Sequence, residues 1–169
     1  MCGLPSASPS GFIRPLKINY IRMKNLFLDT NIILDLLAYR MPFYTETAKL
    51  FSLADKKLVK LSISSLCLAD AHYILSKQNP EMQVRNILRT FKVLVNVLPL
   101  DDKITDLALN SEFRDFEDAI QYYTAIENDQ DLIITRNQQD FKESKLPVMT
   151  AGEFIKSIKN KSATKTESK

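Results

Sequence analysis

Residues 25–33 read NLFLDTNII, in which a short apolar run over 25–28 ends at Asp29. A short apolar run of this kind indicates a buried strand. Thr30 and Asn31 follow with polar side chains of the type that start helices, and residues 32–37 continue with apolar residues at helical spacing. The stretch therefore predicts a strand that passes at once into a helix, with an aspartate at the junction.

The same alternation of strand and helix continues along the chain. Further strands are expected at 59–64, 95–98, 131–135 and 147–149. Helices are expected over 44–56, 115–128 and 152–158, and others are expected to begin after Ser64, Asn79 and Asp101. This order predicts an α/β fold, with a central parallel sheet of about four to five strands and helices packed on its faces. Functional residues of such sheets gather beyond the carboxyl ends of the strands.

Composition excludes several kinds of active site. The chain has 169 residues, enough for one domain, and only 3 glycines, none between Gly11 and Gly152. Phosphate-binding loops built from backbone amides need glycine in the core of the domain, so none is expected here. His72 and the two cysteines, Cys2 and Cys67, are too few and too far apart for a four-ligand zinc site. The abundant functional groups are carboxylates.

The charge divides the chain into three parts. The net charge of +3 lies at the ends, because residues 24–155 carry 15 basic and 19 acidic residues. We expect a disordered extension over 1–23, with the native start at Met23, a folded domain over 24–158 and a disordered basic tail over 159–169. Basic ends on an acidic body fit a protein that approaches nucleic acid, or they serve only solubility.

No run approaches the ~20 apolar residues that a membrane helix needs, and no signal peptide is expected. Two distant, unpaired cysteines suit a reducing compartment, so we expect a cytoplasmic protein.

Acidic and amide side chains recur at the predicted strand ends and helix starts. Asp29 ends the first strand, Asp70 lies in the helix after the second, and Asp118 lies near the start of a later helix. Asn137 follows the fourth strand, with Asp140 three residues on. Carboxylates gathered at one edge repel one another unless a hard cation such as Mg²⁺ lies between them. Such a site would activate water toward a phosphodiester.

Each of these residues also has a purely structural interpretation. Asp29 would cap the helix that follows it, Asp118 would complete a capping box opened by Asp115, and Asn137 would belong to a turn. Asp70 is harder to explain in this way, because an acid beside an apolar helix face needs a partner. His72 is interpreted as an ordinary residue at the edge of the core.

The four segments that carry these residues resemble the motifs of PIN domains, in order and spacing, over residues 24–158. They are FLDTNIILD (27–35), SISSLCLAD (62–70), DFEDAIQ (115–121) and LIITRN (132–137) with Asp140 and Phe141. The resemblance implies a three-layer α/β/α fold and a metal-dependent endoribonuclease. It also implies that the protein is the VapC-like toxin of a bacterial toxin–antitoxin pair.

Carried over by position, the resemblance makes Asp29 and Asp118 the principal ligands of Mg²⁺ or Mn²⁺. Asp70 takes an acidic position where glutamate is more usual in the family. Asn137 stands where many members have a fourth aspartate, and an amide ligates without charge. Glu117, Asp115 and Asp140 are candidates to compensate. Asn31 and Thr135 are expected to orient the carboxylates.

The partners implied are an RNA substrate, an antitoxin protein and a second copy of the chain in a homodimer, with no membrane. Two alternatives stay open. One is a degenerate PIN fold that binds RNA or protein without cleaving, which Asn137 favours. The other is a flavodoxin-like or receiver-type protein, which the absence of an acid before Asp29 disfavours.

Overall fold

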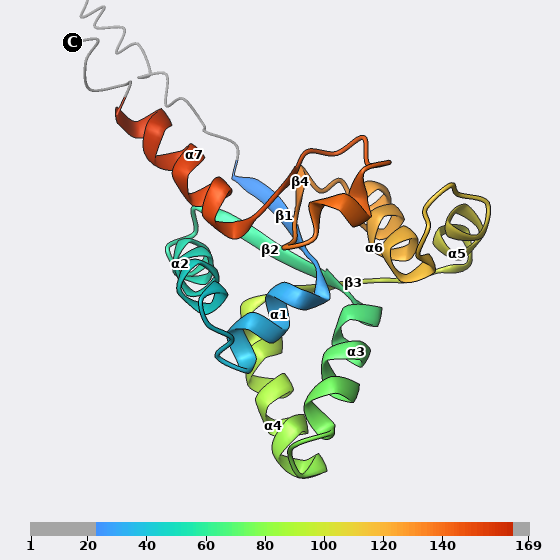
Figure 1. Ribbon diagram of the computed structural model, residues 1–169, viewed down its shortest axis with the longest axis horizontal. Helices are drawn as coiled ribbons and strands as arrows, with labels where there is room; N and C mark the ends of the chain where they lie inside the picture. The colour runs from blue at the N-terminus through green and yellow to red at the C-terminus, as the bar shows by residue number, and fades with distance from the viewer. Residues whose placement is uncertain (1–22, 164–169) are drawn as a thin grey trace, which may run out of the picture.

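The computed structural model describes the backbone of residues 23–163 and the side chains of residues 23–158 (Figure 1). The expected extension before Met23 and the tail after Ala163 lie outside the described residues. Within residues 23–163, no helix has both the length and the hydrophobicity needed to cross a bilayer.

The centre of the molecule is a sheet of 5 parallel strands in the order β3-β2-β1-β4-β5. The strands are β1 (Lys24–Leu28), β2 (Val59–Ser64), β3 (Asn96–Leu98), β4 (Leu132–Ile134) and β5 (Val148–Met149). The segments 26–28 and 132–134 are fully buried because β1 and β4 have neighbours on both edges and helices on both faces. The predicted parallel sheet is thereby confirmed, with the upper number of strands expected.

Two helical layers cover the sheet, as the right-handed crossovers of parallel strands require. One layer contains α1 (Thr30–Leu37), α2 (Phe43–Asp55), α3 (Ser65–Ser76), α4 (Glu81–Phe91) and α7 (Ala151–Ala163). The other contains α5 (Asp102–Leu109) and α6 (Phe116–Glu127), which pack on each other (Figure 1). Two short 3₁₀ turns, η1 (Lys92–Leu94) and η2 (Gln138–Phe141), complete the described elements. The three-layer α/β/α fold is confirmed.

The C-terminal helix differs from the prediction. It was expected over 152–158, but α7 starts at Ala151 and continues to Ala163. The predicted domain boundary at residue 158 therefore falls inside a helix. Phe154 and Ile155 anchor the N-terminal half of α7 in the core, which explains why the apolar pattern reveals only that half.

Strand pairing brings the ends of β1, β2 and β4 to one edge of the sheet. Leu28 is in register with Ile134, and the backbone N–H of Asp29 donates to the carbonyl of Ile134 at 3.0 Å. On the other side of β1, Phe27 is in register with Ser62 of β2. The residues that follow β1 and β4 therefore lie side by side, although they are about a hundred positions apart in the chain.

Ser64 joins β2 to α3 and caps that helix. Its buried hydroxyl accepts a hydrogen bond from the backbone N–H of Cys67 at 3.0 Å. We expect Ser64→Ala to lower the free energy of unfolding by about 1 kcal/mol, because an amide at the helix start loses its partner. Urea unfolding measures the change, with Ser65→Ala at the exposed neighbouring position as control. Equal losses in the two variants would contradict the capping role.

Candidate active site

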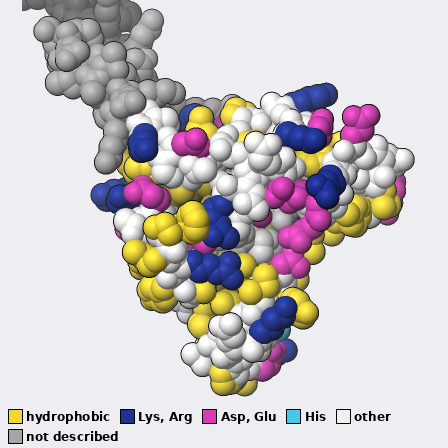
Figure 2. Space-filling model, in the orientation of Figure 1, with side chains coloured by type: hydrophobic (Ala, Val, Ile, Leu, Met, Phe, Trp, Pro, Cys, Tyr) yellow, Lys and Arg dark blue, Asp and Glu magenta, His cyan; other side chains and the backbone are white. Residues whose placement is uncertain are grey.

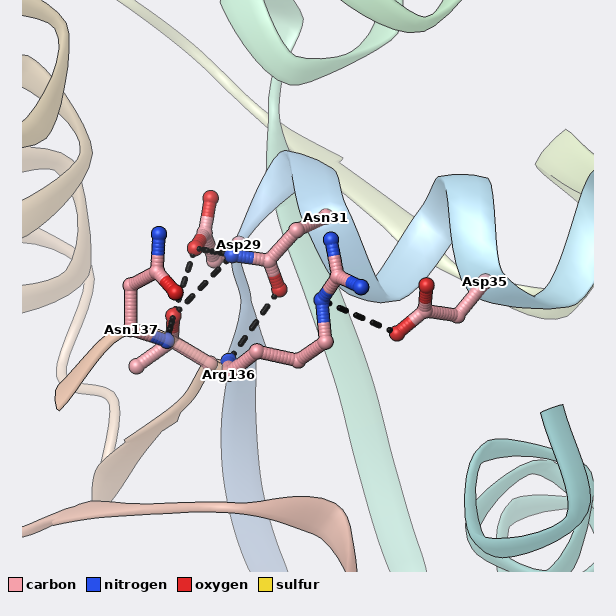
Figure 3. A network of polar contacts seen from close by, with 6 residues as sticks. Asp29, Asn31, Asp35, Arg136 and Asn137 are labelled. Atoms are coloured by element: carbon pink, nitrogen blue, oxygen red, sulfur yellow. Dashed lines mark hydrogen bonds and ion pairs between the residues drawn. The ribbon is translucent and has the colours of Figure 1, made fainter. Parts of the chain in front are cut away.

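Asp29 is the buried centre of the polar residues at this edge of the sheet. It occupies the N-cap position of α1, yet its carboxylate makes no capping hydrogen bond. Instead, Oδ2 accepts hydrogen bonds from Thr135 Oγ1 at 2.6 Å and from Asn31 Nδ2 (Figure 3). The interpretation of the Asp29 side chain as a helix cap is therefore wrong, and its position must have another reason.

Asn31 and Thr135 form a bracket that fixes this carboxylate, and the backbone N–H groups of the next two residues hold the bracket in place. Asn31 Nδ2 also donates to Thr135 Oγ1 at 3.2 Å, and Asn31 Oδ1 accepts from the backbone N–H of Arg136 at 3.2 Å. The N–H of Asn137 donates to Thr135 Oγ1 at 3.0 Å. The contacts of Asn31 and Thr135 are those of residues that orient Asp29, and the effect of that orientation on activity stays a prediction.

The start of α6 brings a second group of acids toward Asp29. Asp115 caps the helix, since its Oδ1 accepts from the backbone N–H groups of Glu117 at 2.8 Å and Asp118 at 3.4 Å. The Glu117 carboxylate faces α1 and accepts from Thr30 Oγ1 at 3.4 Å. It also accepts from Nε2 of the buried Gln121 at 3.0 Å. The capping role expected of Asp115 is confirmed. The carboxylates of Glu117 and Asp118 do not cap the helix among the described residues, so they can act in the site.

Asp70 on α3 meets the acids of α6 through Glu117. Burial raises the pKa of Asp70, and the neighbouring Glu117 opposes this rise. The charge of Asp70 in turn raises the pKa of Glu117, so the two carboxyl groups titrate as a pair. Oδ2 of Asp70 is buried and has no hydrogen-bond partner among the described residues. The structure thus brings Asp70 to the site and leaves one of its oxygens unsatisfied.

The pKa values report how closely the acids are gathered. Loss of water and the charges of Asp70, Asp29 and Asp115 raise the pKa of Glu117 to about 7. Loss of water, with the charges of Asp29, Asp115, Asp140 and Glu117, raises the pKa of Asp118 to about 7. Burial also raises the pKa of Asp29, against the hydrogen bond from Thr135. Carboxyl groups that hold protons near neutral pH mark a place where negative charge is unfavourable without a cation.

The last part of the site lies on η2. Asn137 is exposed directly before the first residue of η2, and Asp140 is exposed within η2. A hollow of about 550 Å³ lies between η2 and the start of α6 and is lined by Asp118, Asp140, Arg114 and Lys142, among others. Asn137 and Asp140 therefore flank the acids, and the structure assigns neither a direct contact with the Asp29 carboxylate.

Gln121 carries no sequence-based prediction of a role. Arg136 was expected at the end of the fourth strand as a candidate to hold a phosphate beside the scissile one, but its partner was not predicted. Gln121 is buried between Thr30 and Glu117, and Arg136 pairs with the buried Asp35. Gln121 follows Glu117 by one helical turn, a spacing that could have identified it as a partner. No comparable signal links Asp35 and Arg136, because their contact depends on the pairing of β1 with β4.

A divalent metal fits the chemistry of these donors. Within residues 23–158, no three His, Cys, Asp or Glu side chains converge closely enough as they stand to hold a metal ion. The raised pKa values and the unsatisfied Asp70 oxygen nevertheless match a set of carboxylates arranged for a hard cation. Asp29, Asp118 and Asp70 are the candidate ligands, with Glu117 beside them.

Comparisons with known proteins identify the family. The family model described as PIN domain matches residues 25–139. The chain belongs to the PIN domain family. This match spans all four motifs of the sequence, and no curated protein sequence matches the chain.

Solved structures with the PIN fold include toxin–antitoxin complexes. DNA-bound VapBC from Salmonella typhimurium superposes with a TM-score of 0.61 at 16% identity, over 76% of this chain and 99% of that one. VapBC2 from Rickettsia felis, bound to a promoter fragment, gives 0.58 at 23% identity, over 75% and 98%. VapC20 from Mycobacterium tuberculosis, a toxin that cleaves the Sarcin-Ricin loop, gives 0.52 at 13% identity, over 64% and 86%. At these identities the likeness establishes the fold.

The electrostatic arrangement predicts an unusual dependence of stability on pH. The folded protein holds protons on Asp118 and Glu117 up to a pH of about 7, whereas the unfolded chain releases them near the ordinary pKa values of about 4. The folded state therefore binds more protons between about pH 4 and 7, and the free energy of unfolding of the metal-free protein falls as the pH rises through this range.

Asp118→Asn removes one of the repelling charges. At pH 8 in EDTA, we expect the variant to have a higher melting temperature than the wild type, by about 2–4 °C for each kcal/mol of repulsion that the substitution removes. At pH 5 the two melting temperatures should be closer. Differential scanning calorimetry measures the effect, with Asp106→Asn on the exposed face of α5 as control. A lower melting temperature for Asp118→Asn at pH 8 would show that its charge is not strained.

Proposed function

We propose that the chain is a Mg²⁺- or Mn²⁺-dependent endoribonuclease and the toxin of a bacterial toxin–antitoxin pair. The observation that carries this proposal is that Asp29, Asp118, Asp70 and Glu117 lie near enough to raise one another's pKa values at the carboxyl end of a parallel sheet. Membership of the PIN family supports it. The similarity to VapBC structures and to a toxin that cleaves the Sarcin-Ricin loop also supports it.

In the proposed mechanism, Asp29 and Asp118 hold the metal ion and Asp70 completes its acidic surroundings. A bound Mg²⁺ supplies Lewis acidity and lowers the pKa of a coordinated water. Thr135 and Asn31 keep the Asp29 carboxylate in one orientation, so its charge does not need to reorganise during the reaction. Glu117 lies beside these ligands, and its carboxylate accepts hydrogen bonds from Thr30 at 3.4 Å and Gln121 at 3.0 Å.

The surroundings of the acids suit a polyanionic substrate. Arg114 and Lys142 line the same hollow as the carboxylates Asp118 and Asp140. Cations placed next to a metal site can hold the phosphates that flank the scissile one. An antitoxin would have to block the hollow beside Asp118. A basic side chain of the antitoxin would be attracted to the acids there. The proposed assembly also includes a homodimer.

Loss of either principal ligand should abolish cleavage. Asp29→Asn and Asp118→Asn keep the side-chain volume and remove a charge, so the rate of cleavage of single-stranded RNA in Mg²⁺ or Mn²⁺ should fall by orders of magnitude. Gel analysis of a labelled RNA measures the rate, with Asp106→Asn as control. Wild-type cleavage by the site variants, or full cleavage in EDTA, would contradict a metal-dependent reaction.

Restoring a fourth acid should strengthen the metal site. Asn137→Asp adds a negative charge on η2 beside the other acids, so half-maximal activity should need less Mn²⁺. Titration of the cleavage rate with Mn²⁺ measures this, and Asn86→Asp on exposed α4 controls for net charge. An unchanged Mn²⁺ requirement would exclude residue 137 from the metal's surroundings.

The second candidate function is an RNA- or protein-binding module without catalysis, which Asn137 favours because it brings no charge. A binding module need not take up Mn²⁺. Calorimetric titration of the wild type with Mn²⁺ therefore separates the two functions. Wild-type protein that binds RNA, does not bind Mn²⁺ and does not cleave RNA would support the binding module.

A further inference from the structure

A second hollow lies on the other side of Arg136 from the acids. It has a volume of about 430 Å³ and lies between α1, the start of α2 and the beginning of α7. Ile32, Phe43 and Ala151 give it apolar walls, and its charged side chains are Arg136, Asp35 and Glu46. None of the proposed catalytic carboxylates lines this hollow, so it is distinct from the metal site.

The Arg136 guanidinium is fixed on two sides. It lies 4.5 Å from the centre of the Phe43 ring, and its Nε lies 3.4 Å from Oδ2 of Asp35 (Figure 3). The Asp35 side chain is fully buried, and neither of its oxygens makes a hydrogen bond within the described residues. Their contact is therefore an ion pair without hydrogen-bond geometry. Nε of Arg136 is buried without a hydrogen-bond acceptor. A guanidinium has four further N–H donors on its terminal nitrogens, and none of them donates to a residue in the range 23–158.

This guanidinium belongs to the same rigid unit as the catalytic aspartate. The backbone N–H of Arg136 donates to Asn31 Oδ1, and Asn31 donates to the Asp29 carboxylate. Figure 3 shows the Arg136 side chain leading from this bracket toward Asp35. A phosphate bound at the guanidinium would therefore keep a fixed relation to a phosphate bound near Asp29.

The connection between α1 and α2 adds exposed aromatic rings next to this cation. Phe43 is 43% exposed and Tyr39 is 70% exposed, and the Tyr39 and Tyr44 rings lie 4.9 Å apart. Arg40 lies in the same connection. Figure 2 shows basic and hydrophobic side chains gathered on this face beside a band of acidic ones. Cations and exposed rings together are the features with which proteins bind unpaired nucleotides.

We propose that Arg136 and Phe43 form a nucleotide subsite for single-stranded RNA, adjacent to the scissile phosphate. The guanidinium binds the phosphate of this nucleotide through its free donors, and the Phe43 face opposite the guanidinium stacks on its base. Charge complementarity favours RNA over a peptide. Arg136 and Arg40 both act on the single charge of Asp35. Glu46 is paired with Lys49 at 2.9 Å, and a phosphate supplies several acceptors to the remaining cation. This subsite rests on the proposed function, and it adds a requirement for an unpaired base beside the cleaved bond.

Binding experiments in the catalytically blocked Asp118→Asn protein test the subsite. The probes are short single-stranded RNAs that carry 2-aminopurine at successive positions, read by fluorescence quenching and by the dissociation constant. We expect quenching at one position, its loss in Phe43→Ala, and a dissociation constant raised about 5- to 100-fold. Arg136→Lys keeps the charge beside Asp35 and loses the planar fork, so binding should weaken while its salt dependence stays the same.

Matched controls lie on α4, away from both hollows. Met82→Ala removes an exposed apolar side chain, as Phe43→Ala does, and Arg89→Lys makes the same exchange as Arg136→Lys. Both should bind and quench like the parent. Phe43 is largely on the surface, so Phe43→Ala remains informative even if Arg136→Lys proves unstable.

The outcomes separate this inference from the proposed function. Cleavage by the wild type together with unchanged binding and quenching in Phe43→Ala and Arg136→Lys would overturn the subsite alone. Absence of both RNA binding and cleavage in the wild type would overturn the proposed function and the subsite with it. A third outcome is that Phe43→Ala binds RNA as before but no longer binds the antitoxin. This would assign the surface to the antitoxin and overturn the subsite.

Discussion

The pairing of β1 with β4 is the constraint on which the rest of the structure depends. It places the end of β1 beside the end of β4 through the hydrogen bond from Asp29 N–H to the Ile134 carbonyl. Thr135 can then hold the Asp29 carboxylate, and Arg136 can reach Asp35 on α1. The site and the second hollow are both consequences of this one register, because a slip of one residue would turn each side chain to the opposite face of the sheet.

Gathering the acids at this edge is unfavourable, and the structure shows how the cost is limited. Asp29 receives donors from Thr135 and Asn31, Asp115 is occupied as a helix cap, and Glu117 keeps its proton up to a pH of about 7. What is left is a set of carboxyl groups that ionise only near neutral pH. A divalent cation would relieve the remaining repulsion, so the same feature that weakens the metal-free protein would favour metal binding.

Much of this could be predicted from the sequence. Buried strands show as short apolar runs, and Asp29, Asp70 and Asp118 stand where strands end or helices begin. The capping role of Asp115 was also visible. The side-chain directions were not: whether Asp29 caps α1 or faces Thr135 depends on β4, more than a hundred residues away. For the same reason the sequence did not show that the Asp70 charge would raise the pKa of Glu117, which was expected only to compensate, nor that Asp35 would pair with Arg136. The continuation of α7 to Ala163 was missed because only its first half is buried in the core.

The central claim is that this edge of the sheet is a metal site built from Asp29 and Asp118. Diffraction data collected at the manganese absorption edge, from crystals grown with Mn²⁺, test it most directly. The account predicts an anomalous peak bounded by these two carboxylates, with Asp70 or Glu117 beside it, and its disappearance in Asp29→Asn. A well-ordered site without a peak, or a peak held by other residues, would contradict the claim.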